Sequence, residues 1–445
     1  MSSEGVDVVT SADDEGRGLL PKLRFPEFRD AGEWAPASIG QFLTESRIVG
    51  GKGDSARKLT VKLWGGGVFA KNEARRGSEN TQYYKRSAGQ FIYSKLDFLN
   101  QAFGVIPAQL DGLESTVDLP CFDIGAGLSP KFLLEYVQRD QFFRRNGELA
   151  DGGRKAKRIQ VEDFLSFSID LPPLPAEQKK IADCLSSLDD LIAAEGDRLA
   201  ALREYKKGLT QQLFPHPERI ENGKKILAET APRLRFPEFK DAGQWERAPL
   251  GPRTSKIGSG ITPKGGQAAY KNVGRPFMRS QNVGWGELRL EDIAFIDERT
   301  HSGFAATEIQ ADDVLLNITG ASIGRSAIAD HRIVGGNVSQ HVCIIRVDRR
   351  ALTPGYLNQF LLGQEGQSQI DSFQAGGNRQ GLNFDQIRSF KIPSPPELDE
   401  QERVADCLSS IDSLLFSADR RISELKAHKS GLMQRLFPSP AEAYE

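Results

Sequence analysis

Basic and aromatic side chains alternate through the first third of the sequence in a pattern suited to duplex DNA. Basic groups neutralise phosphates and release bound counterions, while tyrosine rings can pack on sugars or base edges. Each residue taken alone is equally compatible with an ordinary solvated surface, so the prediction depends on the group. The candidate DNA-contacting residues of this region are Lys62, Arg75, Arg76, Tyr84, Lys85, Lys95, Arg154, Lys155 and Lys157.

A second region is less basic and richer in amides and small residues. Asn and Gln side chains can bond adenine through two hydrogen bonds, Arg can do the same to guanine, and Gly lets the backbone approach a groove. Ordinary turns and surfaces use the same residue types, so this reading also depends on the cluster. The candidates are Arg279, Gln281, Asn282, Asn317, Thr319, Ser322, Arg325, Asn337, Gln340, Asn378, Arg379 and Gln380.

Residue patterns for catalysis are missing from the sequence. It has no HExxH and no GxxxxGK[ST] motif, and the Gly-Ala-Gly at 125–127 lacks the third glycine of a dinucleotide loop. The two Pro-Pro pairs, in LPPL and SPPE, lack the flanking amide and aromatic residues of an amino-methyltransferase motif. The four cysteines and five histidines show no metal-ligand spacing. We therefore expect no catalytic residue, no metal and no cofactor in this chain.

The elements that must position these surfaces are two long helices, predicted at 178–213 and 401–436. Apolar residues recur in each at alternating steps of four and three, which is the seam of a coiled coil. Proline residues lie on both sides of each segment and none lies inside. The predicted helix-pair core is Ile181, Leu185, Leu188, Ile192, Leu199, Leu202 and Leu209 with Val404, Leu408, Ile411, Leu415, Ile422, Leu425 and Leu432. The alternative is two ordinary core helices in separate domains.

An internal repeat organises the rest of the chain. The segment LRFPEF at 23–28 returns at 234–239, an offset of 211, whereas the helices repeat at an offset of 223. The two intervening regions barely resemble each other, although short strands and helices near their ends align. The repeat predicts an α+β fold with a pseudo-two-fold axis, in which two mixed α/β domains are separated by two long antiparallel coiled-coil helices.

Three repeated features make this chain resemble the specificity subunits of Type I restriction-modification systems. They are the LRFPEF box, the joint before each helix, in which Glu-Gln is followed by ADCLSS, and the helix endings GLTQQLFP and GLMQRLFP. On this resemblance the domains are a disordered N-terminus at 1–20, target-recognition domains at 21–175 and 233–396, spacer helices at 176–214 and 397–438, a linker at 215–232 and a tail at 439–445.

The resemblance implies that each domain reads one half of a bipartite, asymmetric DNA target and that the helix pair sets the gap. Two modification subunits would supply S-adenosylmethionine and adenine-N6 methyl transfer. Restriction subunits would add cleavage driven by ATP and Mg²⁺, so this chain would be a non-catalytic subunit. The target sequence and spacer length cannot be read from the residues.

Composition and domain organisation argue against several other classes of protein. The 445 residues carry a net charge of -2, and no apolar run approaches a membrane span or a signal peptide. We therefore expect a cytoplasmic protein. A coiled-coil scaffold without DNA specificity would not need two dissimilar domains, and a stand-alone DNA methyltransferase would need a cofactor site.

Overall fold

The computed structural model describes residues 19–71, 78–148, 158–221, 224–263, 265–374 and 381–438. Its contacts divide the chain into two units, which we describe separately. Unit 1 comprises Met1–Glu195 with Arg421–Glu445, and unit 2 comprises Gly196–Arg420. Each unit therefore takes one end of the first long helix and the opposite end of the second.

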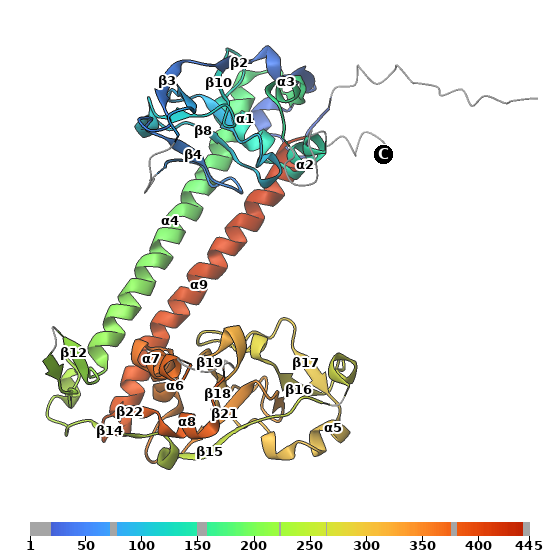
Figure 1. The fold of residues 1–445 in the computed structure, drawn as a ribbon. Helices are drawn as coiled ribbons and strands as arrows, with labels where there is room; N and C mark the ends of the chain where they lie inside the picture. The colour runs from blue at the N-terminus through green and yellow to red at the C-terminus, as the bar shows by residue number, and fades with distance from the viewer. Residues whose placement is uncertain are drawn as a thin grey trace, which may run out of the picture. The chain divides into compact units, whose positions relative to one another are not determined.

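The two long helices are α4, Pro175–Leu213, and α9, Leu398–Leu436, each of 39 residues. They confirm the predicted helices at 178–213 and 401–436 and begin three residues earlier. Pro175 is tolerated as the first helical residue because the N–H that it lacks has no partner within a helix. Within each unit the two helices lie side by side (Figure 1).

Unit 1 contains a four-stranded sheet in the order β2-β10-β7-β8 and a three-stranded sheet in the order β3-β6-β9. Two strand pairs, β1-β11 and β4-β5, complete it. The strands are β1 Ala35–Ser38, β2 Leu43–Ser46, β3 Val49–Lys52, β4 Leu59–Val61, β5 Val68–Ala70, β6 Gln82–Lys85, β7 Phe91–Tyr93, β8 Phe103–Val105, β9 Glu114–Ser115, β10 Cys121–Ile124 and β11 Ser168–Leu171. The short helices are α1 Pro130–Val137, α2 Asp140–Gly147 and α3 Val161–Ser166.

Unit 2 contains a four-stranded sheet in the order β15-β21-β18-β19 and a three-stranded sheet in the order β17-β16-β20. Its strands are β12 Arg219–Glu221, β13 Lys224–Ile226, β14 Glu246–Pro249, β15 Thr254–Ser259, β16 Arg275–Met278, β17 Ala294–Ile296, β18 Val314–Asn317, β19 Ser326–Ile328, β20 Asn337–Val338, β21 Val342–Val347 and β22 Lys391–Ser394. The short helices are α5 Glu298–Ser302, α6 Pro354–Leu362, α7 Gln364–Ser372 and α8 Phe384–Ser389.

The four-stranded sheets of the two units correspond strand for strand, although their sequences barely match. β7 and β8 of unit 1 return as β18 and β19 of unit 2, at the same offset of 223 residues as the helices. The three-stranded sheets differ, because β6 pairs with β9 antiparallel whereas β16 pairs with β20 parallel. The two units therefore share the arrangement of the four-stranded sheet and differ in the three-stranded sheet.

Each unit packs its sheet against α1 or α6 and the adjoining helix ends. The core of unit 1 is rich in aromatic rings, with Phe91, Tyr93, Phe122 and Phe164 all buried. Unit 2 uses more aliphatic residues, such as Leu316 and Ile345 on neighbouring strands.

The predicted linker is partly structured, and most of the two predicted terminal segments lies outside the described residues. The linker at 215–232 contains the two-stranded hairpin β12-β13. The N-terminal residues 1–18 and the tail at 439–445 lie outside the described residues. None of the helices in the described ranges is long and apolar enough to cross a membrane.

Candidate DNA-reading surfaces and the helix clamps that hold them

The first LRFPEF box joins the beginning of α4 to the end of α9 in unit 1. The Arg24 guanidinium donates to both carboxylate oxygens of Glu177, at 2.8 and 2.7 Å, and to the Gly32 carbonyl at 2.6 Å. The neighbouring Leu23 N–H donates to the Arg435 carbonyl, at 2.8 Å, in the last turn of α9. The pair Arg24–Glu177 is buried and bidentate, which is the strong geometry for this pairing.

The second box forms the same arrangement in unit 2. Arg235 donates to both oxygens of Glu400, at 2.7 Å each, and to the Ala242 carbonyl at 2.8 Å. The Leu234 N–H donates to the Gln212 carbonyl, at 2.9 Å, near the end of α4. We call each set of contacts a helix clamp. Because a clamp takes the start of one helix and the end of the other, the two helices run antiparallel within each unit.

An aromatic pair closes each helix clamp. Trp34, which follows the first box, meets Phe437 beyond α9 with ring centroids 6.1 Å apart. Trp245 meets Phe214 beyond α4 at 6.4 Å, and both contacts are edge-to-face. The repeated endings of the two long helices therefore serve to place a phenylalanine against the tryptophan of a box.

The glutamine that follows each clamp glutamate fixes the adjacent domain helix. Gln178 accepts from the Ser129 N–H at 3.0 Å, and Gln401 accepts from the Thr353 N–H at 2.9 Å. Ser129 and Thr353 are the N-cap residues of α1 and α6. The repeated Glu-Gln joint thus connects both the box and the domain to the long helix, which explains why its sequence repeats while the domain surfaces diverge.

The predicted helix-pair core is buried or half-buried at every position in the list. Charged side chains of α4 and α9 also pair across the two helices within each unit. Lys429 of α9 contacts Asp189 of α4 at 2.6 Å in unit 1, and Lys206 of α4 contacts Asp412 of α9 at 2.6 Å in unit 2. Glu195, in a seam position of α4, pairs with Arg421 at 3.0 Å.

The candidate residues of the first region lie in more than one place. Lys62 extends from the end of β4, with its ammonium 3.9 Å from the centroid of the Phe69 ring. Tyr84 and Lys85 lie on β6, half-buried and exposed respectively. Lys95 instead contacts Gln160, before α3, at 3.3 Å. Five further candidates, Arg75, Arg76, Arg154, Lys155 and Lys157, lie outside the described residues.

Arg86, beside these candidates in sequence, has a structural role. Its side chain is 2% exposed and donates to the Ser46 carbonyl at 2.6 Å and the Ser115 hydroxyl at 2.8 Å. Burial lowers the pKa of this guanidinium from its ordinary value. Arg86 therefore joins β2 to β9 and is not available to a phosphate.

One acidic residue, Asp292, forms hydrogen bonds with three candidates of the second region. Asp292 accepts hydrogen bonds from Arg279, from Gln281 and, at 3.1 Å, from Asn282. Arg279 and Gln281 keep an accessible surface, and Asp292 sets the direction of both side chains. Sequence analysis missed Asp292, because a lone surface aspartate carries no signal of its own.

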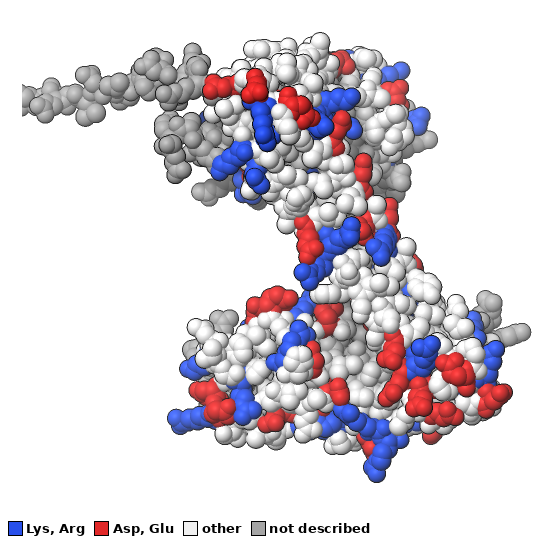
Figure 2. Space-filling model, turned by 180° about the vertical axis from the view of Figure 1, so that it is seen from behind, with Lys and Arg blue, Asp and Glu red and all other residues white. Residues whose placement is uncertain are grey.

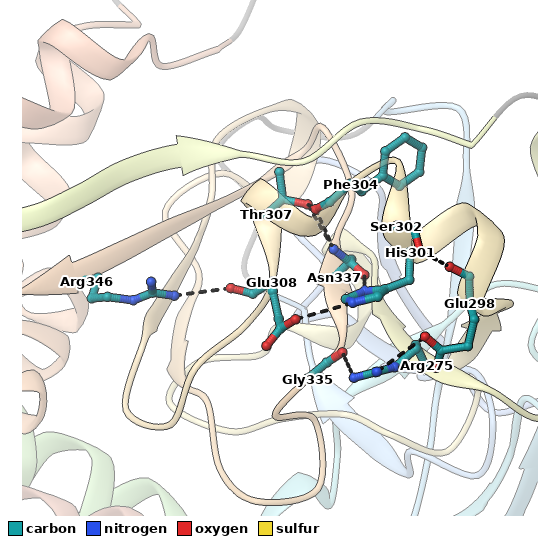
Figure 3. A network of polar contacts seen from close by, with 10 residues as sticks. All are labelled: Arg275, Glu298, His301, Ser302, Phe304, Thr307, Glu308, Gly335, Asn337 and Arg346. Carbon is teal, nitrogen blue, oxygen red and sulfur yellow. Dashed lines mark hydrogen bonds and ion pairs between the residues drawn. The ribbon is translucent and has the colours of Figure 1, made fainter.

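Three predicted base-reading amides are corrected by the structure, because Asn282, Asn317 and Asn337 are fully buried. The Asn317 amide donates to the Ser280 carbonyl at 2.7 Å. Figure 3 shows Asn337 between His301, which lies 2.7 Å from its amide oxygen, and the Phe304 carbonyl, to which it donates at 2.9 Å. These amides satisfy the backbone of their own loops instead of facing a ligand.

Four described candidates of the second region, Thr319, Ser322, Arg325 and Gln340, keep an accessible surface. The Thr319 hydroxyl lies 2.6 Å from His341 Nδ1, and Gln340 lies 3.3 Å from the other ring nitrogen. Ser322 and Arg325 follow in the next loop and are half-buried. Asn378, Arg379 and Gln380 lie outside the described residues, just before Gly381, which bridges to Thr319. His341 is a polar surface residue that sequence spacing alone could not assign.

The described ranges contain no group of His, Cys, Asp and Glu side chains that could hold a metal ion. Burial raises the pKa of the Cys121 and Cys343 thiols to about 12. Cys184 and Cys407, at matching positions of α4 and α9, are free and half-buried.

Comparisons with known proteins agree with this geometry. A family model described as "Type I restriction modification DNA specificity domain" matches residues 132–204 and 300–427. Each matched segment contains the domain helix, the Glu-Gln joint and much of a long helix.

Relatives and a solved structure extend the match. The MjaVIII specificity subunit of Methanocaldococcus jannaschii is 24% identical over 424 residues, which is 93% of each chain. The MjaX specificity subunit of the same organism is 25% identical over 197 residues, covering 43% of this chain and 45% of that protein. The S subunit from M. genitalium shares the fold, with a TM-score of 0.59 at 15% identity over 95% of this chain and 100% of that one. Together these matches support the assignment of this chain as a DNA specificity subunit of a Type I restriction-modification system.

Proposed function

We propose that the domains of the two units read different halves of one bipartite, asymmetric DNA target and that the helix pair sets the distance between the halves. The single observation that carries this proposal is the contrast between repeated clamps and divergent domain surfaces. The contacts of Arg24 with Glu177 and of Arg235 with Glu400 are the same, whereas the three-stranded sheets are built differently. Two half-sites of different sequence require such a contrast.

Each domain would contact one stretch of major groove, with the two stretches about one helical turn apart. Phosphate contacts would set the register, and loop side chains would read base edges. In the first domain the accessible candidates are Lys62, Tyr84, Lys85 and Lys95. In the second they are Arg279, Gln281, Thr319, Ser322, Arg325 and Gln340. The same proposal includes the candidates Arg75, Arg76, Arg154, Lys155, Lys157, Asn378, Arg379 and Gln380.

The chemistry would come from partner subunits. Two modification subunits would bind S-adenosylmethionine, flip an adenine from each half-site and methylate its N6. Restriction subunits would add ATP- and Mg²⁺-dependent cleavage. The complex would act in the cytoplasm, and this chain would supply only the choice of target.

The direct test is to combine the full chain with its modification subunit and to map methylated adenines in genomic DNA. We expect methylation at one bipartite motif with a fixed gap, one adenine in each half. Methylation without a motif would support a scaffold role, and methylation by the chain alone would contradict the division of labour.

A variant test separates the halves. Replacing Arg379 and Gln380 with alanine should weaken binding through the second half-site only, because both residues belong to the second domain. Binding assays with duplexes altered in one half would measure this. Equal losses for both halves would contradict the assignment.

A further inference from the structure

We propose that two matched hairpin turns, carrying Trp64 in unit 1 and Trp285 in unit 2, are docking points for two copies of one partner protein. This inference rests on the proposed function, under which the partner is the modification subunit. It adds the residues at which that subunit would be held. We call the segments 63–66 and 284–287 the Trp-Gly turns.

The Trp-Gly turn of unit 1 links β4 to β5. The Gly66 N–H donates to the Leu63 carbonyl at 3.1 Å, which closes the turn around Trp64 and Gly65. Both central residues have positive φ, at 57° and 67°. Two hydrogen bonds then fix the turn to the rest of the unit, from the Trp64 N–H to Asn100 at 2.7 Å and from the Gly65 N–H to Gln101 at 3.1 Å.

The Trp-Gly turn of unit 2 shares the central Trp-Gly pair, but its closing hydrogen bond runs in the opposite direction along the chain. The Gly284 N–H donates to the Glu287 carbonyl at 2.9 Å, so Trp285 and Gly286 are again the central pair. Gly286 has a φ of 94°. Its N–H donates at 2.9 Å to the Ser326 carbonyl at the start of β19, the strand that corresponds to β8 of unit 1.

Both turns lie against equivalent points of the scaffold. A side chain added at Gly65 would meet the side chain of Gln138, the C-cap of α1, at 3.1 Å. One added at Gly286 would meet Leu362, the last residue of α6, at 3.3 Å. Because α1 and α6 are equivalent helices, the two turns occupy the same place although the surrounding sequences have diverged.

Each turn presents its tryptophan to solvent. Trp64 is 65% exposed and Trp285 is 48% exposed, whereas the two tryptophans of the helix clamps are buried. Leu63, the first residue of this turn, is 43% exposed and adds apolar surface next to Trp64. A large aromatic residue on a backbone fixed by hydrogen bonds loses little entropy on binding, and such residues dominate protein interfaces.

The charges around Trp285 favour a protein over DNA as the partner. Trp285 lines a cleft of about 2070 Å³ together with Leu415 and Phe416 of α9. Basic and acidic side chains line this cleft in nearly equal numbers, and many of them pair with each other, as Arg289 does with Glu287 at 2.8 Å. Figure 2 likewise shows Lys and Arg interspersed with Asp and Glu on the face of unit 2 that it draws. Such a lining gives no net attraction for a polyanion but suits a protein surface of balanced charge.

Because each unit has one Trp-Gly turn, we expect two copies of the partner, one for each turn. Two half-sites of different sequence would be met by different residues, but both units place a tryptophan before a positive-φ glycine. A surface that is the same twice fits a partner that is present twice. The modification subunit is the component that the proposed function requires in two copies.

The test measures binding of purified modification subunit to the full chain by sedimentation, with Trp64→Ala, Trp285→Ala and the double variant. Leu227→Ala, at a side chain that is 72% exposed and outside both turns, is the control. Each single variant should weaken one of two binding steps by about 30-fold, as for an interface hot spot. The double variant should weaken both steps, and Trp64→Phe should restore most of the loss. Thermal unfolding would confirm that the variants fold.

The outcomes distinguish this inference from the proposed function. If the unmodified chain binds no modification subunit, the proposed function fails. If the unmodified chain binds two copies and the double variant binds them equally well, only the docking inference fails. If the variants lose affinity for duplex DNA and keep both partner copies, the turns are DNA contacts and the inference is overturned.

Discussion

Lys206 of α4 and Asp412 of α9 form a 2.6 Å ion pair in unit 2 that Lys429 and Asp189 repeat in unit 1. In both units a domain helix adds a third member. Gln359 of α6 donates to Asp412 at 2.8 Å, but its counterpart in α1 is Glu135, which lies 3.0 Å from Lys429. Unit 1 therefore buries one carboxyl group more than unit 2 at equivalent places.

This difference predicts a pH dependence for unit 1. Burial raises the pKa of Glu135 above its ordinary value of 4.5, although Lys429 opposes the shift. A carboxyl group whose pKa is raised by folding stabilises the folded state fully below its unfolded pKa, and this contribution is lost as the pH rises through the folded value. Glu135→Gln should therefore make unit 1 more stable above pH ~4.5, measured by urea unfolding across the pH range. Gln359→Glu is the reciprocal control and should destabilise unit 2, because it would place a second carboxyl group beside Asp412.

The helix clamps predict large losses of stability from single changes. Replacing Arg24 with alanine leaves the Glu177 carboxylate, which is 1% exposed, without its charged partner. Breaking a buried pair in this way costs about 3–5 kcal/mol. Hydrogen exchange should show faster opening at the start of α4 and the end of α9. Arg233→Ala, which removes an exposed pair with Glu229, should change stability by less than about 0.5 kcal/mol. Equal effects of the two variants would contradict the role of the clamp.

The parts of this architecture that were predictable from the sequence depend on long, repeated patterns. The seam from Ile181 to Leu209 identifies a coiled coil because an apolar stripe of that length is rare in any other setting. The boxes at 23–28 and 234–239 mark equivalent points because whole motifs recur. Their role in clamping opposite helix ends was not predictable, since no local pattern shows which distant carboxylate Arg24 meets.

The common four-stranded sheet and the buried amides show what the sequence cannot provide. Strands such as β7, of three residues, are too short for a reliable pattern, and their pairing is set by tertiary packing. Asn317 and Asn337 have the side chains expected for adenine recognition, but the same groups bond the backbone of their own loops. Chemistry alone does not distinguish these uses, whereas burial does.

The DNA proposal predicts a specific salt effect for Lys85, which is exposed on β6. If its ammonium neutralises a phosphate, Lys85→Ala should lower the slope of log K against log salt by roughly 0.9. The loss should be the same for all target sequences, because a phosphate contact carries no base information. Filter binding at several salt concentrations would measure the slope. Lys207→Ala, at an exposed residue of α4, should leave it unchanged.

The four cysteines should differ in reactivity in the folded chain. Burial raises the pKa of Cys121 and Cys343 to about 12, so at pH 8 their thiolate fraction falls roughly a thousandfold below that of an ordinary thiol. Iodoacetamide should therefore label Cys184 and Cys407 in native protein and all four residues in denaturant. Mass spectrometry would identify the sites. Rapid labelling of Cys343 in native protein would show that the sheet of unit 2 opens readily.

The role of the helix pair as a ruler predicts a change in target spacing. Deleting the facing segments 196–202 of α4 and 415–421 of α9 removes one heptad from each helix, so the seam keeps its phase. The pair shortens by about 10 Å, because a helix rises about 1.5 Å per residue. The gap between half-sites should then decrease by about three base pairs, at ~3.4 Å per base pair. Methylation of a library of targets with varied gaps would measure the preference. Duplicating the same segments is the matched control and should widen the gap by the same amount. If neither variant changes the preferred gap, the helices do not set the spacing.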